Sequence, residues 1–131
     1  MKELQIGMKN IMTEIVDRNN IAESMGSGTL PVYATPAVAA LAEGAAYKLI
    51  EPYLSQGITS VGTKINVEHI AASSVGAEIT AEAVLREFDG RKYCFDITVS
   101  DNAGVVAKIY HERFTVKKDK FLMKAEQRGI Q

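Results

Sequence analysis

Between residues 35 and 50 the chain reads Thr35-Pro-Ala-Val-Ala-Ala-Leu-Ala-Glu43-Gly-Ala-Ala-Tyr-Lys-Leu-Ile50. A threonine followed by a proline is typical of a helix start, with the hydroxyl at the N-cap and the proline at the first helical position. Alanine and aliphatic residues occupy nearly all sides of this stretch, a pattern that indicates burial. The pattern ends before Pro52, so the sequence predicts one buried helix over residues 36–50.

One residue of this helix does not fit a purely apolar environment. Glu43 is a carboxylate among alanines, and carboxylates are rarely buried without a partner or a task. A candidate partner is His69, which ends a later alternating stretch and shares the parity of its β-branched residues. An acid and an imidazole that both lie among apolar residues indicate a functional site.

A period of two, which is typical of strands, governs most of the chain after Gly57. In residues 60–69 we expect one set to face inward, namely Val61, Thr63, Ile65, Val67 and His69. Further strands are predicted over residues 77–88, 91–100 and 105–117, with turn signals at Asp89-Gly90 and Asp101-Asn-Ala-Gly104. The other predicted segments are a strand within 4–16, a mobile or tightly turned connection over 17–34, and a short helix or frayed end from Lys118.

This order predicts an α+β fold in which a curved antiparallel sheet of about five strands wraps around one central helix. Four consecutive hairpin-linked strands must cover an apolar element, and the helix over 36–50 is the one available. We predict a single domain over residues 1–131. Because one helix makes a thin core, we expect a homodimer or a dimer of dimers.

Composition excludes several classes of protein. The 131 residues carry a net charge of −1, which leaves no electrostatic footprint for a nucleic acid. No stretch approaches the ~20 apolar residues of a membrane span. Cys94 is the single cysteine, which excludes an internal disulfide and a multi-cysteine metal site and is typical of a cytoplasmic protein. We therefore expect no nucleic acid, membrane or metal as a partner.

Three segments carry a resemblance to a known family, namely Ala34–Ala46, Thr59–Ala72 and His111–Phe114. Glu43 lies 8 positions after Thr35, and His69 lies 26 positions after Glu43. In these motifs and spacings the chain, from about residue 7 to 123, resembles the thioesterases related to fluoroacetyl-CoA thioesterase.

The resemblance implies a hot-dog fold and the hydrolysis of a small acyl-CoA thioester by a homodimer that binds its substrate at the subunit interface. It implies catalytic roles for Thr35, Glu43 and His69, supporting roles for Gly62 and Arg113, and no cofactor besides the CoA of the substrate. The family's enzyme for fluoroacetyl-CoA has aromatic residues before the helix that discriminate fluorine, whereas residues 25–29 here are Met-Gly-Ser-Gly-Thr. The resemblance therefore implies thioester hydrolysis without fluoroacetyl selectivity, and we expect Tyr33, the nearest aromatic residue, to close the pocket.

The chemistry leaves alternatives open. Thr35 could attack the thioester carbonyl, or it could orient water or substrate at a helix N-terminus that offers free N–H groups. Glu43 could be the base for water or the nucleophile, and His69 could protonate the departing thiolate. Thr35 and Glu43 are about 12 Å apart along a helix that rises ~1.5 Å per residue. We therefore expect the two to act across a dimer interface or with substrate between them.

Each of these residues also has an ordinary structural interpretation. The alternatives are an N-cap for Thr35, an exposed helix stripe for Glu43, a structural histidine for His69, a β-bulge for Gly62 and a surface ion pair with Glu112 for Arg113. At the level of function, the alternative is a non-catalytic module that binds or senses acyl-CoA. A hot-dog dehydratase is disfavoured because the Asp/His motif of that branch is not evident.

Overall fold

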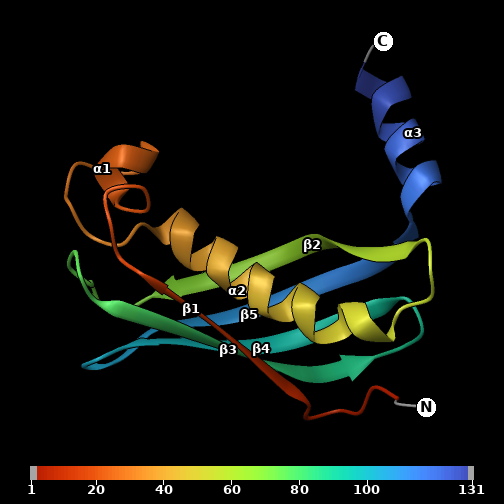
Figure 1. The fold of residues 1–131 in the computed structure, drawn as a ribbon, viewed down its shortest axis with the longest axis horizontal. Helices are drawn as coiled ribbons and strands as arrows, with labels where there is room; N and C mark the ends of the chain where they lie inside the picture. Colours follow the sequence, from red (N-terminus) through yellow and green to blue (C-terminus); the bar gives the residue numbers. More distant parts are fainter. Residues whose placement is uncertain (1–2, 130–131) are drawn as a thin grey trace.

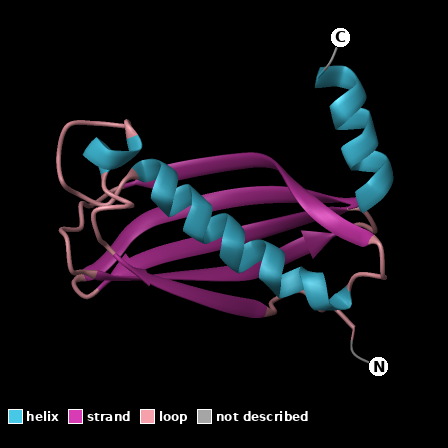
Figure 2. Cartoon of the chain, turned by 45° about the horizontal axis from the view of Figure 1, so that its top comes forward, coloured by secondary structure: helices cyan, strands magenta, loops and turns pink. Residues whose placement is uncertain are grey.

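Five antiparallel strands and one long helix make up the core of the computed structural model, which describes residues 3–129 (Figures 1 and 2). The strands are β1 (Lys9–Ile15), β2 (Ile58–His69), β3 (Glu78–Phe88), β4 (Lys92–Asp101) and β5 (Gly104–Lys117), and the long helix is α2 (Thr35–Ile50). They form one sheet in the order β1-β3-β4-β5-β2, and α2 lies across one face of it. The predicted α+β fold is confirmed, whereas the predicted domain ends at residues 1 and 131 lie outside the described residues.

The core lies between α2 and the inner face of the sheet. The buried residues of α2 are Ala37, Val38, Leu41, Ala42, Ala45, Ala46, Leu49 and Ile50. On β3 and β4 the residues predicted to face inward, from Ile79 to Leu85 and from Tyr93 to Val99, are buried at alternate positions. Ala42, Ala45 and Ala46 are fully buried, so small side chains let the helix lie close to the strands.

The helix start differs from the prediction. Ala34 is the N-cap residue, with extended backbone angles, and no side chain caps the helix. Thr35 is the first helical residue, and its hydroxyl bonds to a side chain of β2 instead of to the helix backbone. The N-cap interpretation of Thr35 is therefore wrong, because a tertiary partner takes the hydroxyl.

The strand β2 also differs from a regular alternation. Its register with β5 shifts between Gly62 and Lys64, so one extra residue lies in β2 at this point. Before the shift Ser60 faces the interior and is buried, and after it Ile65 pairs with the buried His111. The expected inward facing of Val61 and Thr63 is wrong, because the bulge reverses the parity of the strand.

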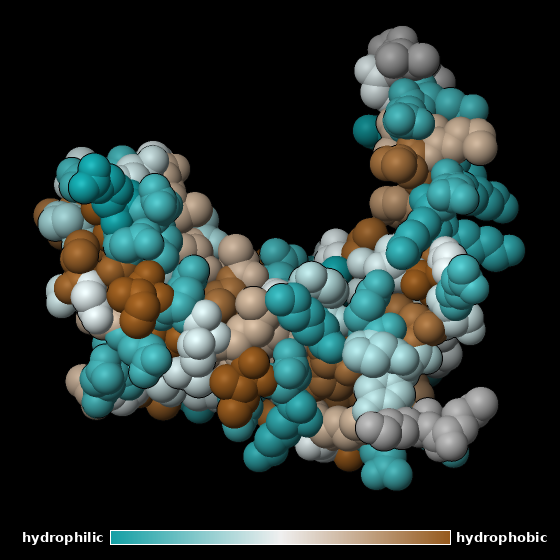
Figure 3. Space-filling model, viewed as in Figure 1, coloured by the Kyte–Doolittle hydropathy of each residue, from teal (hydrophilic) through white to brown (hydrophobic). Residues whose placement is uncertain are grey.

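Backbone pairing orders the long connection between β1 and α2. Residues 17–34 contain the short helix α1 (Ala22–Met25), and a bridge between Ile21 and Tyr33 closes the segment on itself. A 3₁₀ turn, η1 (Glu51–Tyr53), follows α2, and the helix α3 (Lys118–Gly129) follows β5. Helix α3 projects from the body and buries none of its side chains (Figure 3). Within residues 3–129, no helix has the length and apolar character needed to cross a bilayer.

Candidate active site

A hydroxyl and an imidazole meet where the start of α2 lies against the end of β2. Thr35 Oγ1 and His69 Nδ1 are 2.8 Å apart, a hydrogen-bond distance. The other ring nitrogen of His69, Nε2, is buried without a hydrogen-bond partner in the described part of the chain. A buried polar atom left unpaired costs about 1–3 kcal/mol, and a functional role would account for this cost.

The pair borders a cavity of about 310 Å³. Its lining comes from α1 and the segments beside the helix start, namely Ala22, Ser27, Val32, Tyr33, Thr35, His69, Ile70, Ala71 and Ala72. Most of these side chains are small or apolar, and Thr35 and His69 supply the reactive polar atoms. This is the composition of a pocket for a small apolar group beside a hydroxyl and an imidazole.

A second group of polar side chains surrounds Gly62, at the β2 bulge. A β-carbon built on Gly62 would lie 2.7 Å from Oε2 of Glu43, so the carboxylate lies directly against the bare backbone of this glycine. The same position would be 3.1 Å from His111 Cε1 and 3.4 Å from Arg113 Nη1. Side chains of α2 and β5 therefore converge on one residue of β2, and a β-carbon at this residue would displace the Glu43 carboxylate.

Arg113 is held rigidly in this group. Its Nε donates to Ser60 Oγ at 2.8 Å and its Nη2 to the Ser60 carbonyl at 3.0 Å, while Nη1 lies 3.2 Å from His111 Nε2. Burial lowers the pKa of the Arg113 guanidinium, and the negative charges of Glu43 and Glu51 act in the opposite direction. A guanidinium stays charged in proteins, so Arg113 supplies a fixed positive charge near the Glu43 carboxylate.

His111 is fully buried and its tautomer follows from its partners. Nδ1 lies 2.8 Å from the carbonyl oxygen of Lys64 and must carry the proton, since a carbonyl can only accept. Nε2 is then free to accept from Arg113 Nη1. Burial, followed by the charge of Arg113, lowers the pKa of the His111 imidazole, which keeps it neutral.

His111 and Ser60 are not among the site residues predicted from the sequence. The available signal was the parity of β5, where His111 and Arg113 share the face of buried Ala107 and Ile109. Two polar side chains on an apolar face indicate a polar group inside the fold. Ser60 carried no usable signal, because the bulge places it on the face opposite to the one expected.

Tyr33 lines the cavity, and its hydroxyl is already hydrogen-bonded within the protein. Its side chain is buried, and its hydroxyl donates to the Glu14 carboxylate and lies 3.3 Å from the Ala37 carbonyl. Burial and the neighbouring Glu14 raise the pKa of the Tyr33 phenol far above its usual range. Tyr33 can therefore shape the pocket, but it keeps its proton.

Within one chain the predicted residues fall into two groups. Thr35 lies with His69, whereas Glu43 lies with Gly62 and Arg113, and no hydrogen bond or ion pair among residues 3–129 joins Glu43 to His69. Thr35 and Glu43 are eight positions apart on α2, which is about 12 Å at ~1.5 Å per residue.

Two of the ordinary interpretations can be compared with these contacts. The surface ion pair of Arg113 with Glu112 is wrong, because Glu112 pairs with Lys92 at 3.4 Å and accepts from Tyr110, while Arg113 is buried. The β-bulge at Gly62 is confirmed, and it coexists with the contact to Glu43.

A long helix enclosed by a curved antiparallel sheet is the hot-dog fold. A crystal structure of a thioesterase superfamily member from Thermus thermophilus shares it, with a TM-score of 0.87 at 21% identity over 98% of this chain and 97% of that chain. The protein therefore has the hot-dog fold.

The family model described as fluoroacetyl-CoA-specific thioesterase matches residues 16–119, and the chain belongs to this family. The fluoroacetyl-CoA thioesterase of Streptantibioticus cattleyicolor is 34% identical over 97 residues, which are 74% of this chain and 70% of the relative. A crystal structure of a single-residue mutant of the fluoroacetyl-CoA-specific thioesterase FlK matches with a TM-score of 0.91 at 26% identity, over 98% of this chain and 99% of that chain. The protein is thus a thioesterase, a hydrolase of thioesters, as the resemblance implied.

Proposed function

We propose that the protein hydrolyses a small acyl-CoA thioester to the free acid and CoA, with Thr35, Glu43 and His69 as its catalytic residues. The observation that carries this proposal is the hydrogen bond of Thr35 to His69 at the mouth of an apolar cavity, with His69 Nε2 left unpaired. A crystal structure of a FlK mutant in complex with acetyl-CoA, 26% identical at a TM-score of 0.90, supports the substrate class.

Each residue has a role that its surroundings support. Hydrolysis forms a bond from water oxygen to the thioester carbonyl carbon and breaks the carbon–sulfur bond, and the proton lost by water ends on the departing sulfur. Glu43 lies beside the fixed positive charge of Arg113, and its carboxylate can accept a proton from water or attack the carbonyl. His69 Nε2 can deliver a proton to the thiolate, and Thr35 holds the ring through Nδ1 or attacks the carbonyl itself.

A homodimer would bring the two groups together. The α2 face that carries Glu43 also carries Ala40 and Tyr47, which are exposed, and β2 is an edge strand of the sheet with exposed residues from Gly62 to Asn66. Edge strands and unpartnered helix faces are favourable surfaces for a second copy. In such a pair, or in a dimer of dimers, Glu43 of one copy would face the Thr35–His69 pair of the other.

The acyl group is inferred to be small, with Tyr33, Gly62 and Arg113 as substrate-binding residues. A cavity of about 310 Å³ beside Thr35 admits a short chain, and residues 25–29 hold no aromatic ring that would select for fluorine. We propose that no cofactor is required besides the CoA of the substrate. The protein is proposed to act in the cytoplasm, with which the free thiol of buried Cys94 is compatible.

The test is a panel of acyl-CoA thioesters, from acetyl to branched, aromatic and medium-chain, with released CoA measured by a thiol reagent. We expect turnover of small acyl groups, and a loss of about 100-fold or more in kcat for Glu43→Gln and His69→Gln, since acid–base groups contribute this much. Glu68→Gln, an exposed neighbour of His69, is the matched control. No release from any thioester, with binding detected by calorimetry, would instead identify a non-catalytic acyl-CoA-binding module.

A further inference from the structure

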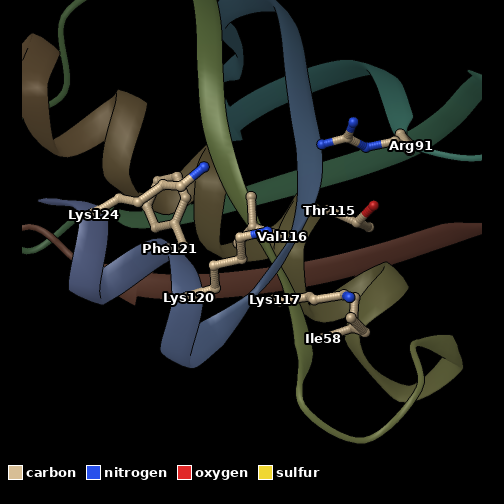
Figure 4. A pocket seen from close by; sticks show the side chains of 8 residues that line it. All are labelled: Ile58, Arg91, Thr115, Val116, Lys117, Lys120, Phe121 and Lys124. Atoms are coloured by element: carbon tan, nitrogen blue, oxygen red, sulfur yellow. The ribbon is translucent and has the colours of Figure 1, made fainter.

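Positive side chains gather around a second cavity, where β5 passes into α3. This cavity of about 470 Å³, which we call the α3 pocket, is lined by Ile58, Arg91, Thr115, Val116, Lys117, Lys120, Phe121 and Lys124 (Figure 4). Figure 4 shows the α3 side chains on one side of the end of β5 and Arg91 on the other. The backbone N–H of Thr115 donates to the Arg91 carbonyl at 2.9 Å, which ties the Arg91 turn to β5.

The positive charge of the α3 pocket is not neutralised by ion pairs. Within residues 3–129 the two ion pairs are Arg86–Asp96 and Lys92–Glu112, and neither includes a cation of the pocket. Asp119 of α3 does not line the pocket but lines an adjoining hollow with Lys117 and Lys120. The eight lining residues include four cations and no acid, which leaves a net positive potential that an anionic ligand would relieve.

The pocket also has an apolar wall. Ile58, Val116 and Phe121 line it, and the Phe121 side chain is 44% exposed although it is a large aromatic group. A flat ring next to several cations is the combination that binds a nucleotide, because the base stacks on the ring while lysines and arginines meet the phosphates. A volume of this size is within the range of small-molecule pockets.

The position of the pocket relates it to the active site. Ile58 pairs with Lys117 and Gly62 pairs with Arg113, so the α3 pocket and the Glu43 group lie on the same two strands. Four residues along a strand correspond to about 13 Å at ~3.3 Å per residue. CoA places its nucleotide and its thioester at opposite ends of a long pantetheine arm, so one molecule can reach both places.

We infer that the α3 pocket binds the nucleotide of the CoA substrate, with Arg91, Lys117, Lys120 and Lys124 at its phosphates and Phe121 against its base. This assignment rests on the proposed function, because it requires a CoA thioester as the substrate. The pocket contacts a part of the substrate that does not react. We expect it to bind this part equally in the ground state and the transition state, so that it acts on KM rather than on the chemical step.

The experiment compares two substrates that share the acyl thioester, acetyl-CoA and acetyl-pantetheine, which lacks the nucleotide. The variant is the double substitution Lys120→Glu/Lys124→Glu. The matched control is Lys118→Glu/Arg128→Glu, which makes the same charge change on α3 at residues that do not line the pocket. Calorimetric titration with free CoA adds a binding readout that does not depend on hydrolysis.

We expect the pocket variant to raise KM for acetyl-CoA and the Kd for CoA on the order of tenfold, with kcat for both substrates unchanged. The control should show a clearly smaller effect, and added salt should reduce the difference between the two variants. Equal CoA affinity of pocket variant, control and wild type would overturn the assignment. A different outcome is that the wild type hydrolyses neither thioester and still binds CoA more tightly than the Lys120→Glu/Lys124→Glu variant does. That result would contradict the proposed hydrolysis and support the assignment of the α3 pocket.

Discussion

Among single residues, Gly62 has the sharpest steric requirement. A methyl group at this position would lie 2.7 Å from Glu43 Oε2, which is closer than non-bonded atoms approach. The carboxylate is the end of a flexible side chain and can move away, so the fold should survive the change. We expect Gly62→Ala to lower kcat about 100-fold, since a 1 Å misplacement of a catalytic group can cost this much, with little change in Tm.

A matched control for this prediction is Gly44→Ala. Its new β-carbon would meet the flexible side chain of Met12, at 2.9 Å from the sulfur, and it lies next to Glu43 in the sequence. We expect this variant to keep wild-type activity. Wild-type kcat in Gly62→Ala, measured with the best thioester of the panel, would show that the carboxylate has no role at the observed position.

At the scale of secondary structure, His111 joins β5 to the irregular part of β2. Its Nδ1–H donates to the Lys64 carbonyl, next to the register shift that interrupts the strand ladder. The imidazole also accepts from Arg113, so one neutral side chain ties the bulge to the guanidinium. This arrangement requires the neutral form, because an imidazolium cannot accept a hydrogen bond.

Stability should therefore depend on pH through His111. Burial lowers its pKa below the ordinary value of 6.5, so the unfolded chain binds a proton at a higher pH than the folded protein does. The stabilisation that neutral His111 contributes is complete above pH 6.5 and decreases as the pH falls below this value. We expect the free energy of unfolding to fall more steeply from about pH 7.5 to about pH 5.5 in wild type than in His111→Gln.

The measurement is chemical denaturation at each pH, followed by a comparison of the two slopes. His111→Gln also removes hydrogen bonds, so it should be less stable at every pH, and only the slope reports the titration. Parallel curves for the two proteins would mean that His111 has the same pKa in the folded and unfolded states.

The elements themselves could be predicted where the pattern is local. The alternation of residues 77–117, the turn at Asp89-Gly90 and the alanine-rich helix all appear in the structure near their predicted bounds. The bulge at Gly62 reversed the facing of Val61 and Thr63, because an extra residue in one strand depends on its pairing with β5. Periodicity along a single segment contains no information about such a shift.

On the scale of the whole molecule, the exposed face of α2 carries the prediction of a dimer. Ala40 is exposed and lies three residues before Glu43, on the same side of the helix. If a second copy covers this face, a charge at residue 40 would be buried without a partner. We expect Ala40→Glu to shift the protein from dimer to monomer and to lose most of its activity.

Light scattering coupled to gel filtration measures the mass of each species, and the thioester assay measures activity on the same fractions. Lys108→Glu is the control. Lys108 is an exposed residue of β5 on the outer face of the sheet, which is the face away from α2 and Ala40. A wild-type protein that is monomeric and fully active would contradict an active site shared between two copies. Each chain would then have to form a complete active site by itself.

Sequence by itself determined the element types, the apolar helix and the catalytic candidates, because period, turn residues and motif spacing are local properties of the chain. Only the tertiary structure decided which side chains meet. Thr35 takes His69 rather than capping its helix, and Glu43 lies against Gly62 near Arg113 and His111. The physical reason is that hydrogen-bond partners and close contacts join residues from different strands and helices, and the packing of the sheet on α2 sets those distances.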